Sequence, residues 1–331
     1  MSLSLFKQSK RYFTGITILL GIIINPLLVT AEENVNVRFS WKLKGEYAPL
    51  YHTQASGKFK SKGLSVNLGE GAGSQAALGA LIQGQEDVVI MPAIFAMTAI
   101  QKGMPIKIAA VYHRSAPVVF ISHPENPILR PSDLEGKTIA SAVGETGTSY
   151  LSTFCAINNI DCDKIKLIQM DRGARVPTFL AKKVDGVSAY LSNDLPILEQ
   201  KTGIKFAVLN LGEFGLEIPG MSAVVSDKGI KENSDTLRKF LAALGDGMAA
   251  TRNDPTAATS SLRKSWDGAP SAAIVEAQVQ ATIDAVSFPA GKPVGWIDVA
   301  YIQATLDMLT EAGTMTDAKK ASDFFTNDLN N

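Results

Sequence analysis

A strand–helix–strand unit near the start of the chain constrains the fold more than any other stretch. Residues 35–41 (VNVRFSW) predict a β-strand that ends at Trp41, and residues 64–68 (LSVNL) predict a second strand after a helix. A glycine-rich loop, residues 69–74 (GEGAGS), then opens another helix. Such a unit is typical of an open parallel sheet, in which ligands bind beyond the carboxyl ends of the strands. We therefore expect an α/β protein with a ligand site at this edge.

The alternation of strands and helices continues and then restarts, which predicts two lobes. Strands are expected at 87–91, 106–112, 117–122, 138–142, 166–170, 186–190, 205–209 and 221–226. Helices are expected at 75–83 (capped by Ser74), 94–102, 150–158, 176–183 and 195–201 (capped by Asn193 and Asp194), and the chain is mostly helical after residue 226. At 331 residues the chain has room for two domains of roughly 100–200 residues each. We expect lobe 1 to comprise residues 32–117 and 218–331, and lobe 2 residues 118–217.

The first 31 residues are expected to be an export signal peptide. Lys7, Lys10 and Arg11 form a basic segment, and residues 16–29 form an apolar one. The small residues Thr30 and Ala31 then suit a cleavage site before residue 32. An uncleaved membrane anchor is the alternative, but the apolar run is shorter than the ~20 residues that span a bilayer. Cleavage would change the formal charge from 0 to 0 − 3 = −3, which gives no general attraction for nucleic acid or anionic lipid.

Cys155 and Cys162 are the only cysteines. An exported chain meets an oxidising compartment, so we expect a short structural disulfide between them, with two separate thiols as the alternative. Their C-x6-C spacing matches neither a redox motif nor a zinc motif. The three histidines, His52, His113 and His123, form no metal-binding pattern with them, and no metal site is expected.

Two glycine-rich loops are candidates for ligand contact. Residues 69–74 resemble a dinucleotide-binding fingerprint, but Ser74 replaces its third glycine and Asp87 begins the next strand instead of ending it. The preferred interpretation is a helix N-terminus whose amides, at Ser74 and Gln75, meet a polar or anionic ligand group; a simple tight turn is the alternative. Residues 144–149 (GETGTS) are the counterpart in lobe 2.

Aromatic and polar residues at other strand ends complete the candidate site. Trp41, Tyr47 and Tyr190 could stack on a flat ligand, with core packing as the alternative. Arg114 could pair with a carboxylate, sulfonate or phosphate, or form a salt bridge between the lobes. Asp194 is expected only to cap a helix. The candidate ligand-binding residues are Trp41, Tyr47, Ser74, Gln75, Pro92, Ala93, His113, Arg114, Glu145, Thr148, Ser149, Asp171, Tyr190 and Asn193.

Catalytic motifs do not stand out in the sequence. It contains no G-x-S-x-G, H-E-x-x-H or P-loop pattern, and no cysteine with a plausible base. We therefore expect no enzyme activity, no catalytic residues and no cofactor.

Several segments resemble one family. The chain is similar to the substrate-binding proteins of ABC transporters, in the group named after alkanesulfonate-binding and NMT1/THI5-like proteins. The residues that carry the resemblance are Trp41 with 48–68, the glycine turn 71–74, 84–89 (GQEDVV), 184–186 (VDG), 213–226, 239–241 (KFL), 254–255 (DP) and 295–298 (GWID). Lys183 stands where the family pattern has a glycine.

This resemblance implies a fold, a location and a role. The implied fold is α/β, the type II periplasmic-binding-protein fold, with two parallel-sheet lobes joined by a two-strand hinge. The implied role is that of a monomer in the periplasm that closes on one small solute and presents it to an ABC permease in the inner membrane. We expect a flat heterocycle such as a thiamine-type pyrimidine precursor; an alkanesulfonate, taurine, nitrate or an aromatic carboxylate is the alternative. A pyrimidine-synthesising enzyme is the rival of another class, but the glutamate- and cysteine-rich motifs of the yeast enzymes are not visible.

Overall fold

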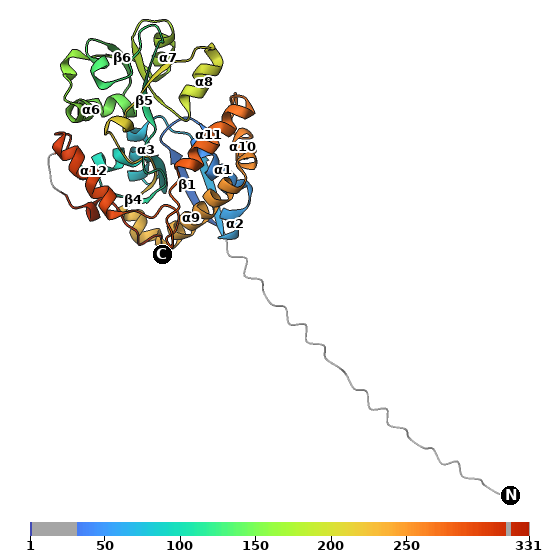
Figure 1. Cartoon of the computed structure of the whole chain (residues 1–331). Helices are drawn as coiled ribbons and strands as arrows, with labels where there is room; N and C mark the ends of the chain where they lie inside the picture. The colour runs from blue at the N-terminus through green and yellow to red at the C-terminus, as the bar shows by residue number, and fades with distance from the viewer. Residues whose placement is uncertain (2–31, 316–318, 331) are drawn as a thin grey trace. The chain divides into compact units, whose positions relative to one another are not determined.

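The computed structural model describes Met1, residues 32–315 and residues 319–330 (Figure 1). The predicted signal peptide, residues 1–31, lies outside these residues apart from Met1, so it stays a prediction. Within the described ranges, no helix combines the length and the apolar character that crossing a membrane requires.

The first sheet has five strands in the order β2-β1-β3-β10-β4. The strands are β1 (Glu33–Phe39), β2 (Leu64–Gly69), β3 (Val88–Pro92), β4 (Ile106–Val111) and β10 (Met221–Ser226). β1 runs parallel to β2 and β3, whereas β10 runs antiparallel to β3 and β4. The apolar run of β3 is buried because the strand lies in the middle of a sheet that helices cover on both faces.

The second sheet also has five strands, in the order β7-β6-β8-β5-β9. The strands are β5 (Val118–Ser122), β6 (Thr138–Ser141), β7 (Lys166–Gln169), β8 (Gly186–Tyr190) and β9 (Ala207–Asn210). β5 is antiparallel to β8 and β9, and β6 is parallel to β7 and β8. The predicted α/β class is therefore confirmed, but each sheet is mixed rather than wholly parallel. The antiparallel strand of the second sheet is β5, the first strand that the chain forms there. The antiparallel strand of the first sheet is β10, which the chain forms when it returns from the second sheet.

Two chain segments connect the sheets and pair with each other. Residues 112–117 lead from β4 to β5, and residues 211–220 lead from β9 to β10. The amide of Ala116 donates to the Ile218 carbonyl (2.8 Å), and the amide of Gly220 donates to the His113 carbonyl (2.9 Å). The predicted lobe boundaries fall in these segments. Because residues 32–331 pack as one compact unit, the division into lobes stays a prediction.

Helices cover both sheets. Around the first sheet lie α1 (Ala48–Ala55), α2 (Lys58–Ser61), α3 (Ser74–Ile82), α4 (Ala93–Gln101) and the C-terminal helices α9 (Asp227–Asn253), α10 (Pro255–Arg263), α11 (Ala272–Ala285) and α12 (Val299–Glu311) (Figure 1). The second sheet carries α5 (Thr146–Ser149), α6 (Leu151–Asn158), α7 (Arg172–Leu180) and α8 (Asp194–Thr202). The apolar face of α9 is buried through Leu237, Phe240, Leu241, Leu244 and Met248. Asp254 caps α10 by accepting from the Ala257 amide (2.9 Å).

Two helix starts differ from the sequence expectation. Ser74 does not cap α3: it is the first helical residue, and Gly73 is the cap, with a φ of 124° that favours glycine. α7 begins at Arg172 and not at Val176, because Asp171 is extended and the helix starts directly after it. Gly173 and Pro177 lower the helix propensity of this segment, which hid its first turn from sequence reasoning. The earlier start places Arg172 and Arg175 on the helix.

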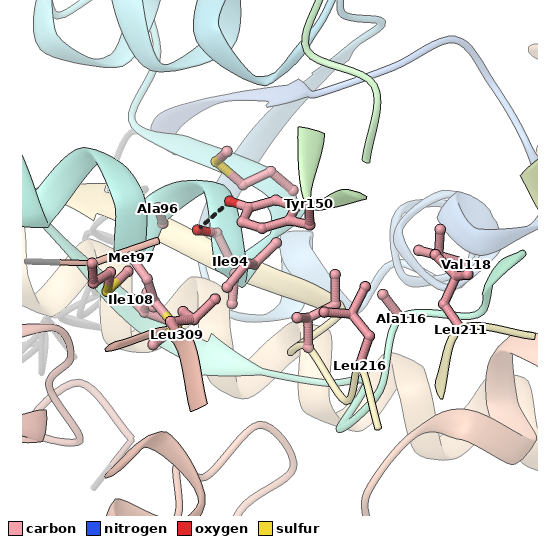
Figure 2. Packing of buried hydrophobic residues seen from close by; sticks show 14 of the residues in the cluster. Ile94, Ala96, Met97, Ile108, Ala116, Val118, Tyr150, Leu211, Leu216 and Leu309 are labelled. Atoms are coloured by element: carbon pink, nitrogen blue, oxygen red, sulfur yellow. Dashed lines mark hydrogen bonds between the residues drawn. The ribbon is translucent and has the colours of Figure 1, made fainter. Parts of the chain in front are cut away.

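A buried apolar cluster joins α4 of the first sheet to the α5–α6 region of the second (Figure 2). Tyr150, only 3% exposed, lies between α5 and α6 and reaches α4. Its hydroxyl donates to the Ile94 carbonyl (3.1 Å; Figure 2). The same hydroxyl lies 2.9 Å from the Thr98 hydroxyl. A buried tyrosine needs such a partner for its hydroxyl, so the contact fixes how these helices meet.

The predicted disulfide is confirmed: Cys155 on α6 is bonded to Cys162 in the following turn, with the Cα atoms 5.7 Å apart. Replacing both cysteines with serine removes this constraint on the unfolded chain. We expect the free energy of unfolding to fall by about 2 kcal/mol, as loop-closure entropy predicts for a short loop. Urea denaturation with and without dithiothreitol measures the effect. The double variant should be insensitive to the reductant, and equal unfolding midpoints for both proteins would contradict a stabilising role.

Candidate functional site

A cavity of about 250 Å³ is lined by residues from both sheets. Its lining follows the carboxyl ends of β1, β3, β6 and β8, which is where an open α/β sheet holds its ligands. The lining residues are Ser40, Trp41, Lys44, Ser74, Pro92, Gly144, Glu145, Thr146, Arg172, Arg175, Val176, Ser188, Ala189, Tyr190, Asp194, Ile197 and Leu198. The volume suits a small molecule and lies below the usual range for drug-sized ligands.

The structure brings part of the predicted site together. Trp41, Ser74, Pro92, Glu145 and Tyr190 line the cavity. The other candidates do not belong to its lining: Tyr47, Gln75, Ala93, His113, Arg114, Thr148, Ser149, Asp171 and Asn193. That any of these residues binds a ligand stays a prediction.

The candidates outside the cavity have other environments. Tyr47 is 1% exposed and stacks on Phe39 with ring centroids 4.1 Å apart, so core packing explains this aromatic residue. Arg114 is exposed, and its guanidinium lies 4.7 Å from the centre of the Tyr301 ring. Asp171 is exposed at the N-cap position of α7, where its side chain makes no capping hydrogen bond. Asn193 is buried just before α8.

Two amides of the first glycine loop bond within the protein, whereas the expected contact of the Ser74 and Gln75 amides with a ligand stays a prediction. The amide of Gly71 donates to the Trp41 carbonyl (3.1 Å), and that of Gly73 donates to the Ser40 carbonyl (2.8 Å). A Cβ at Gly71 would lie 1.8 Å from the Phe39 carbonyl oxygen, so this close approach requires glycine. The loop is therefore a brace for the end of β1, and it positions Trp41.

The second loop uses its own carboxylate. Glu145 caps α5: its Oε1 accepts from the Thr148 amide (3.0 Å) and its Oε2 from the Thr148 hydroxyl (2.8 Å). The Thr148 amide is consequently occupied, and Ser149 faces solvent. Arg175 on α7 lies 3.2 Å from Glu145 Oε2 and donates to the Ser188 carbonyl (3.3 Å). Glu145 thus links the loop to the cavity wall through an ion pair.

A largely buried ion pair joins Lys44, which lines the cavity, to Glu46. Burial alone would raise the pKa of Glu46, but the Lys44 charge and the nearby His113 outweigh it and hold that pKa at about 2. Burial alone would lower the pKa of Lys44, but Glu46 and the surrounding tyrosines keep it above its ordinary value. His113 Nδ1 lies 3.5 Å from Glu46 Oε1. Lys44 therefore stays charged inside the protein.

Two cation–aromatic contacts join the two walls of the cavity, which are formed by residues of the first and of the second sheet. The Lys44 ammonium lies 4.3 Å from the centre of the Tyr190 ring, and the Arg172 guanidinium lies 4.7 Å from that of Trp41. Arg172 also donates to the Val143 carbonyl (3.2 Å). A Cβ at Gly73 would lie 2.4 Å from Arg172 Nη2, so the glycine makes room for this arginine.

Asp194 is not the helix cap that the sequence suggested, because it is the first residue of α8 and Asn193 occupies the cap position. It lines the cavity, and its Oδ2 accepts from the Tyr190 amide (2.7 Å). The surrounding protein raises the pKa of the Asp194 carboxyl through desolvation, although the charge of Lys44 opposes that rise. The Tyr190 hydroxyl lies 3.2 Å from the Thr146 hydroxyl, and burial raises its pKa. A carboxylate and an aromatic ring consequently face the same space.

Sequence reasoning missed most charged residues of the cavity. Lys44, Arg172 and Arg175 belong to no recognisable sequence motif. Because the helix was expected to begin at Val176, the i, i+3 spacing that places the two arginines on one helix face was not apparent. If Glu46 is included as the partner of Lys44, the three positive side chains are matched by the three carboxylates Glu46, Glu145 and Asp194. The formal charge of this group of side chains is therefore 3 − 3 = 0. In the part of the chain that the structure describes, no cluster of three or more His, Cys, Asp or Glu side chains could hold a metal ion.

Comparison with known proteins identifies the fold. The family model described as NMT1/THI5 like matches residues 44–258, and no curated protein matches the chain. The alkanesulfonate-binding protein SsuA from Xanthomonas axonopodis pv. citri, bound to MOPS, has a TM-score of 0.69 and 17% identity over 89% of this chain and 99% of its own. The aliphatic sulphonate binding protein SsuA from Escherichia coli has a TM-score of 0.68 and 16% identity, covering 90% and 98%. The desulfurization enzyme DSZB has a TM-score of 0.60 and 14% identity, covering 89% and 97%. The predicted periplasmic-binding-protein fold is thereby confirmed.

The Glu46 carboxyl should leave a signature in the pH dependence of stability. Its folded pKa of about 2 lies below the ordinary 4.5, so its contribution is complete above pH 4.5 and is lost as the pH falls toward 2. We expect Glu46→Gln to lower the free energy of unfolding at pH 7 by about 3 kcal/mol, because Lys44 remains buried without its partner. Urea denaturation from pH 7 to pH 2 measures the difference, which should narrow below pH 4.5.

The control is Glu232→Gln, which changes an exposed glutamate whose nearest lysine nitrogen, on Lys228, is 3.8 Å away. We expect it to change the free energy of unfolding by less than about 1 kcal/mol at any pH. Parallel pH curves for wild type and Glu46→Gln would contradict the assigned role of the ion pair.

Proposed function

The chain belongs to the NMT1/THI5-like family, and from this premise we propose that it is a solute-binding protein that captures one small molecule in the cavity between its sheets. The cavity draws its walls from both sheets, so a bound molecule contacts both. A ligand shifts a conformational equilibrium only by its differential contacts with the two states. A molecule that touches both walls therefore favours the closed arrangement, in the manner of hinge closure.

The solute is a flat heterocycle with N–H donors, such as a thiamine-type pyrimidine precursor. The observation that carries this proposal is the carboxylate of Asp194, which accepts from the Tyr190 amide and lines the same cavity as Tyr190 and Trp41. No ion pair of Asp194 occurs among the described residues, since Lys44 pairs with Glu46 and Arg175 with Glu145. A carboxylate accepts hydrogen bonds from an amino group or a protonated ring nitrogen, and the aromatic rings match a flat ligand.

An anionic solute is the second candidate, in the form of an alkanesulfonate, taurine, nitrate or an aromatic carboxylate. It is favoured by Arg172, which has no carboxylate partner among the described residues, and by the sulfonate-binding proteins that share the fold. Two observations weigh against it. The positive charges of the cavity are balanced by carboxylates, and the helix starts at α5 and α8 already carry Glu145 and Asp194. An anion would have to compete with these carboxylates.

An enzyme is the rival of another class, because DSZB shares the fold. Product formation distinguishes it from a binding protein. Incubation of catalytic amounts of the protein with excess aminopyrimidine or sulfonate, followed by mass spectrometry, should return the compound unchanged.

The proposed setting is the periplasm. The predicted signal peptide and the family support export, and the family supports delivery of the solute by a monomeric receptor to an ABC permease in the inner membrane. Fractionation of cells that express the full chain tests this location.

Replacing Asp194 with asparagine tests the ligand class. The change substitutes an amide nitrogen donor for one acceptor oxygen and removes the charge, so we expect affinity for an aminopyrimidine to fall at least tenfold, by about 1.4 kcal/mol. Affinity for an alkanesulfonate should stay equal or rise. Isothermal titration calorimetry with 4-aminopyrimidine and methanesulfonate measures both values. Asp163→Asn, an exposed change away from the cavity, is the matched control. Tight sulfonate binding to wild type without aminopyrimidine binding would reverse the ligand assignment.

Replacing Trp41 with alanine tests the stacking wall. Trp41 is partly exposed at the cavity and is held by the Gly71 amide. Loss of the indole should weaken binding of a flat aminopyrimidine at least tenfold, because stacking area and the Arg172 contact are lost together. Calorimetric titration gives the dissociation constant. Trp266→Ala, outside the cavity lining, controls for loss of a tryptophan, and an unchanged dissociation constant for Trp41→Ala would eliminate the stacking role.

A further inference from the structure

Gln278 on α11 is a polar side chain buried away from the cavity lining. It is 0% exposed, and its helix neighbours Val275 and Val279 are buried in the apolar core. Both ends of its side-chain amide are used: Oε1 accepts from the Gly45 amide (3.1 Å), and Nε2 donates to the Asn193 carbonyl (2.6 Å). A buried amide is retained at low energetic cost only when its groups are paired in this way.

The two partners of Gln278 adjoin charged residues of the cavity on opposite walls. Gly45 follows Lys44 in the segment after β1 of the first sheet, and Asn193 precedes Asp194 at the start of α8 beside the second sheet. We infer that Gln278 is a positioning residue that ties the Lys44 and Asp194 segments together across the cavity and stabilises its closed form. The functional meaning of this inference rests on the proposed binding function, whereas the hydrogen bonds of Gln278 are independent of it.

The packing around Gly45 makes the contact specific. A Cβ at Gly45 would lie 2.2 Å from the Gln278 Cβ, so no other residue fits there without moving the glutamine. The main-chain carbonyl of Gln278 also accepts a hydrogen bond from the hydroxyl of Thr282 (2.8 Å), a buried residue on the same helix. Contacts at both the main chain and the side-chain amide of Gln278 therefore fix its position relative to the Lys44 segment.

Gln278 differs from the two cation–aromatic contacts between the walls. Lys44 on Tyr190 and Arg172 on Trp41 belong to the cavity lining, so a ligand can change them directly. Gln278 acts only through main-chain atoms of its neighbours. When the walls separate, the bond to Asn193 breaks while the bond to Gly45, on the same side as α11, is kept. Closure therefore gains a hydrogen bond that no ligand supplies.

Gln278→Glu separates these two bonds. The introduced carboxylate can still accept from the Gly45 amide, but it has no proton to donate to the Asn193 carbonyl. Spin labels at the exposed positions Lys62 and Lys166, one beside each sheet, report the separation of the walls by pulsed electron–electron resonance without any ligand. We expect a short-distance population in wild type and at least a twofold smaller one in the variant at pH 8. Lowering the pH to 5 should restore that population in the variant, because burial at this fully buried position raises the pKa of the introduced carboxyl and a protonated carboxyl can donate.

Gln280→Glu is the matched control. Gln280 lies on the same helix, is exposed, and donates to Asp284 (2.8 Å) instead of bridging the walls. We expect wild-type distances from it at both pH values. If Gln278→Glu fails to fold, Gly45→Ala takes its place, since the added methyl group displaces Gln278.

Each outcome decides the inference. Wild-type distances in a folded Gln278→Glu or Gly45→Ala protein, or the absence of the short-distance population in wild type, overturn it. A smaller closed population without acid recovery in Gln278→Glu overturns the hydrogen-bond assignment. Because these distances are measured without ligand, a failure to bind aminopyrimidines would remove the proposed solute while leaving this result standing.

Discussion

The buried ion pair of Lys44 and Glu46 is the constraint to which the rest of the cavity is fitted. A lysine inside a protein keeps its charge only where a carboxylate and polarisable groups replace the water it has lost. Glu46 supplies the carboxylate, and the Tyr190 ring, from the other sheet, covers the ammonium. The ammonium of Lys44 therefore contacts groups that belong to both sheets.

The order of the strands explains why these residues meet. β1, β3, β6 and β8 all have their carboxyl ends at the cavity. The two connecting segments lead into β5 and β10, which are the antiparallel strands of their sheets. Residues far apart in sequence, such as Trp41 and Arg172, are consequently neighbours. The tight packing at Gly71, Gly73 and Gly45 has the same origin: each glycine lies where a Cβ would collide with a neighbouring segment.

The strands could be predicted from the sequence because their evidence is local. Alternation and apolar runs placed β8 and β10 at the residues that the structure shows, and the others within two residues at each end. The site was harder to predict. Trp41 and Tyr190 were identified from strand ends, but Lys44 and Arg175 depend on which distant carboxylates they meet, and no local pattern encodes that pairing. Tyr47 shows the converse: it stands near the right strand end, but its ring stacks on Phe39 in the core.

The fate of the glycine loops determines how this cavity can select a solute. In the first loop the amides of Gly71 and Gly73 bond to the end of β1, and in the second the Thr148 amide bonds to Glu145. Amides occupied in this way cannot recognise an anion without breaking an internal bond, which would offset the gain. Under the proposed binding function, selectivity therefore rests mainly on side chains of α7 and α8, where Arg172 offers donors and Asp194 offers an acceptor. A solute that offers both an acceptor to Arg172 and a donor to Asp194 then gains more hydrogen bonds in this cavity than a solute that matches only one of them.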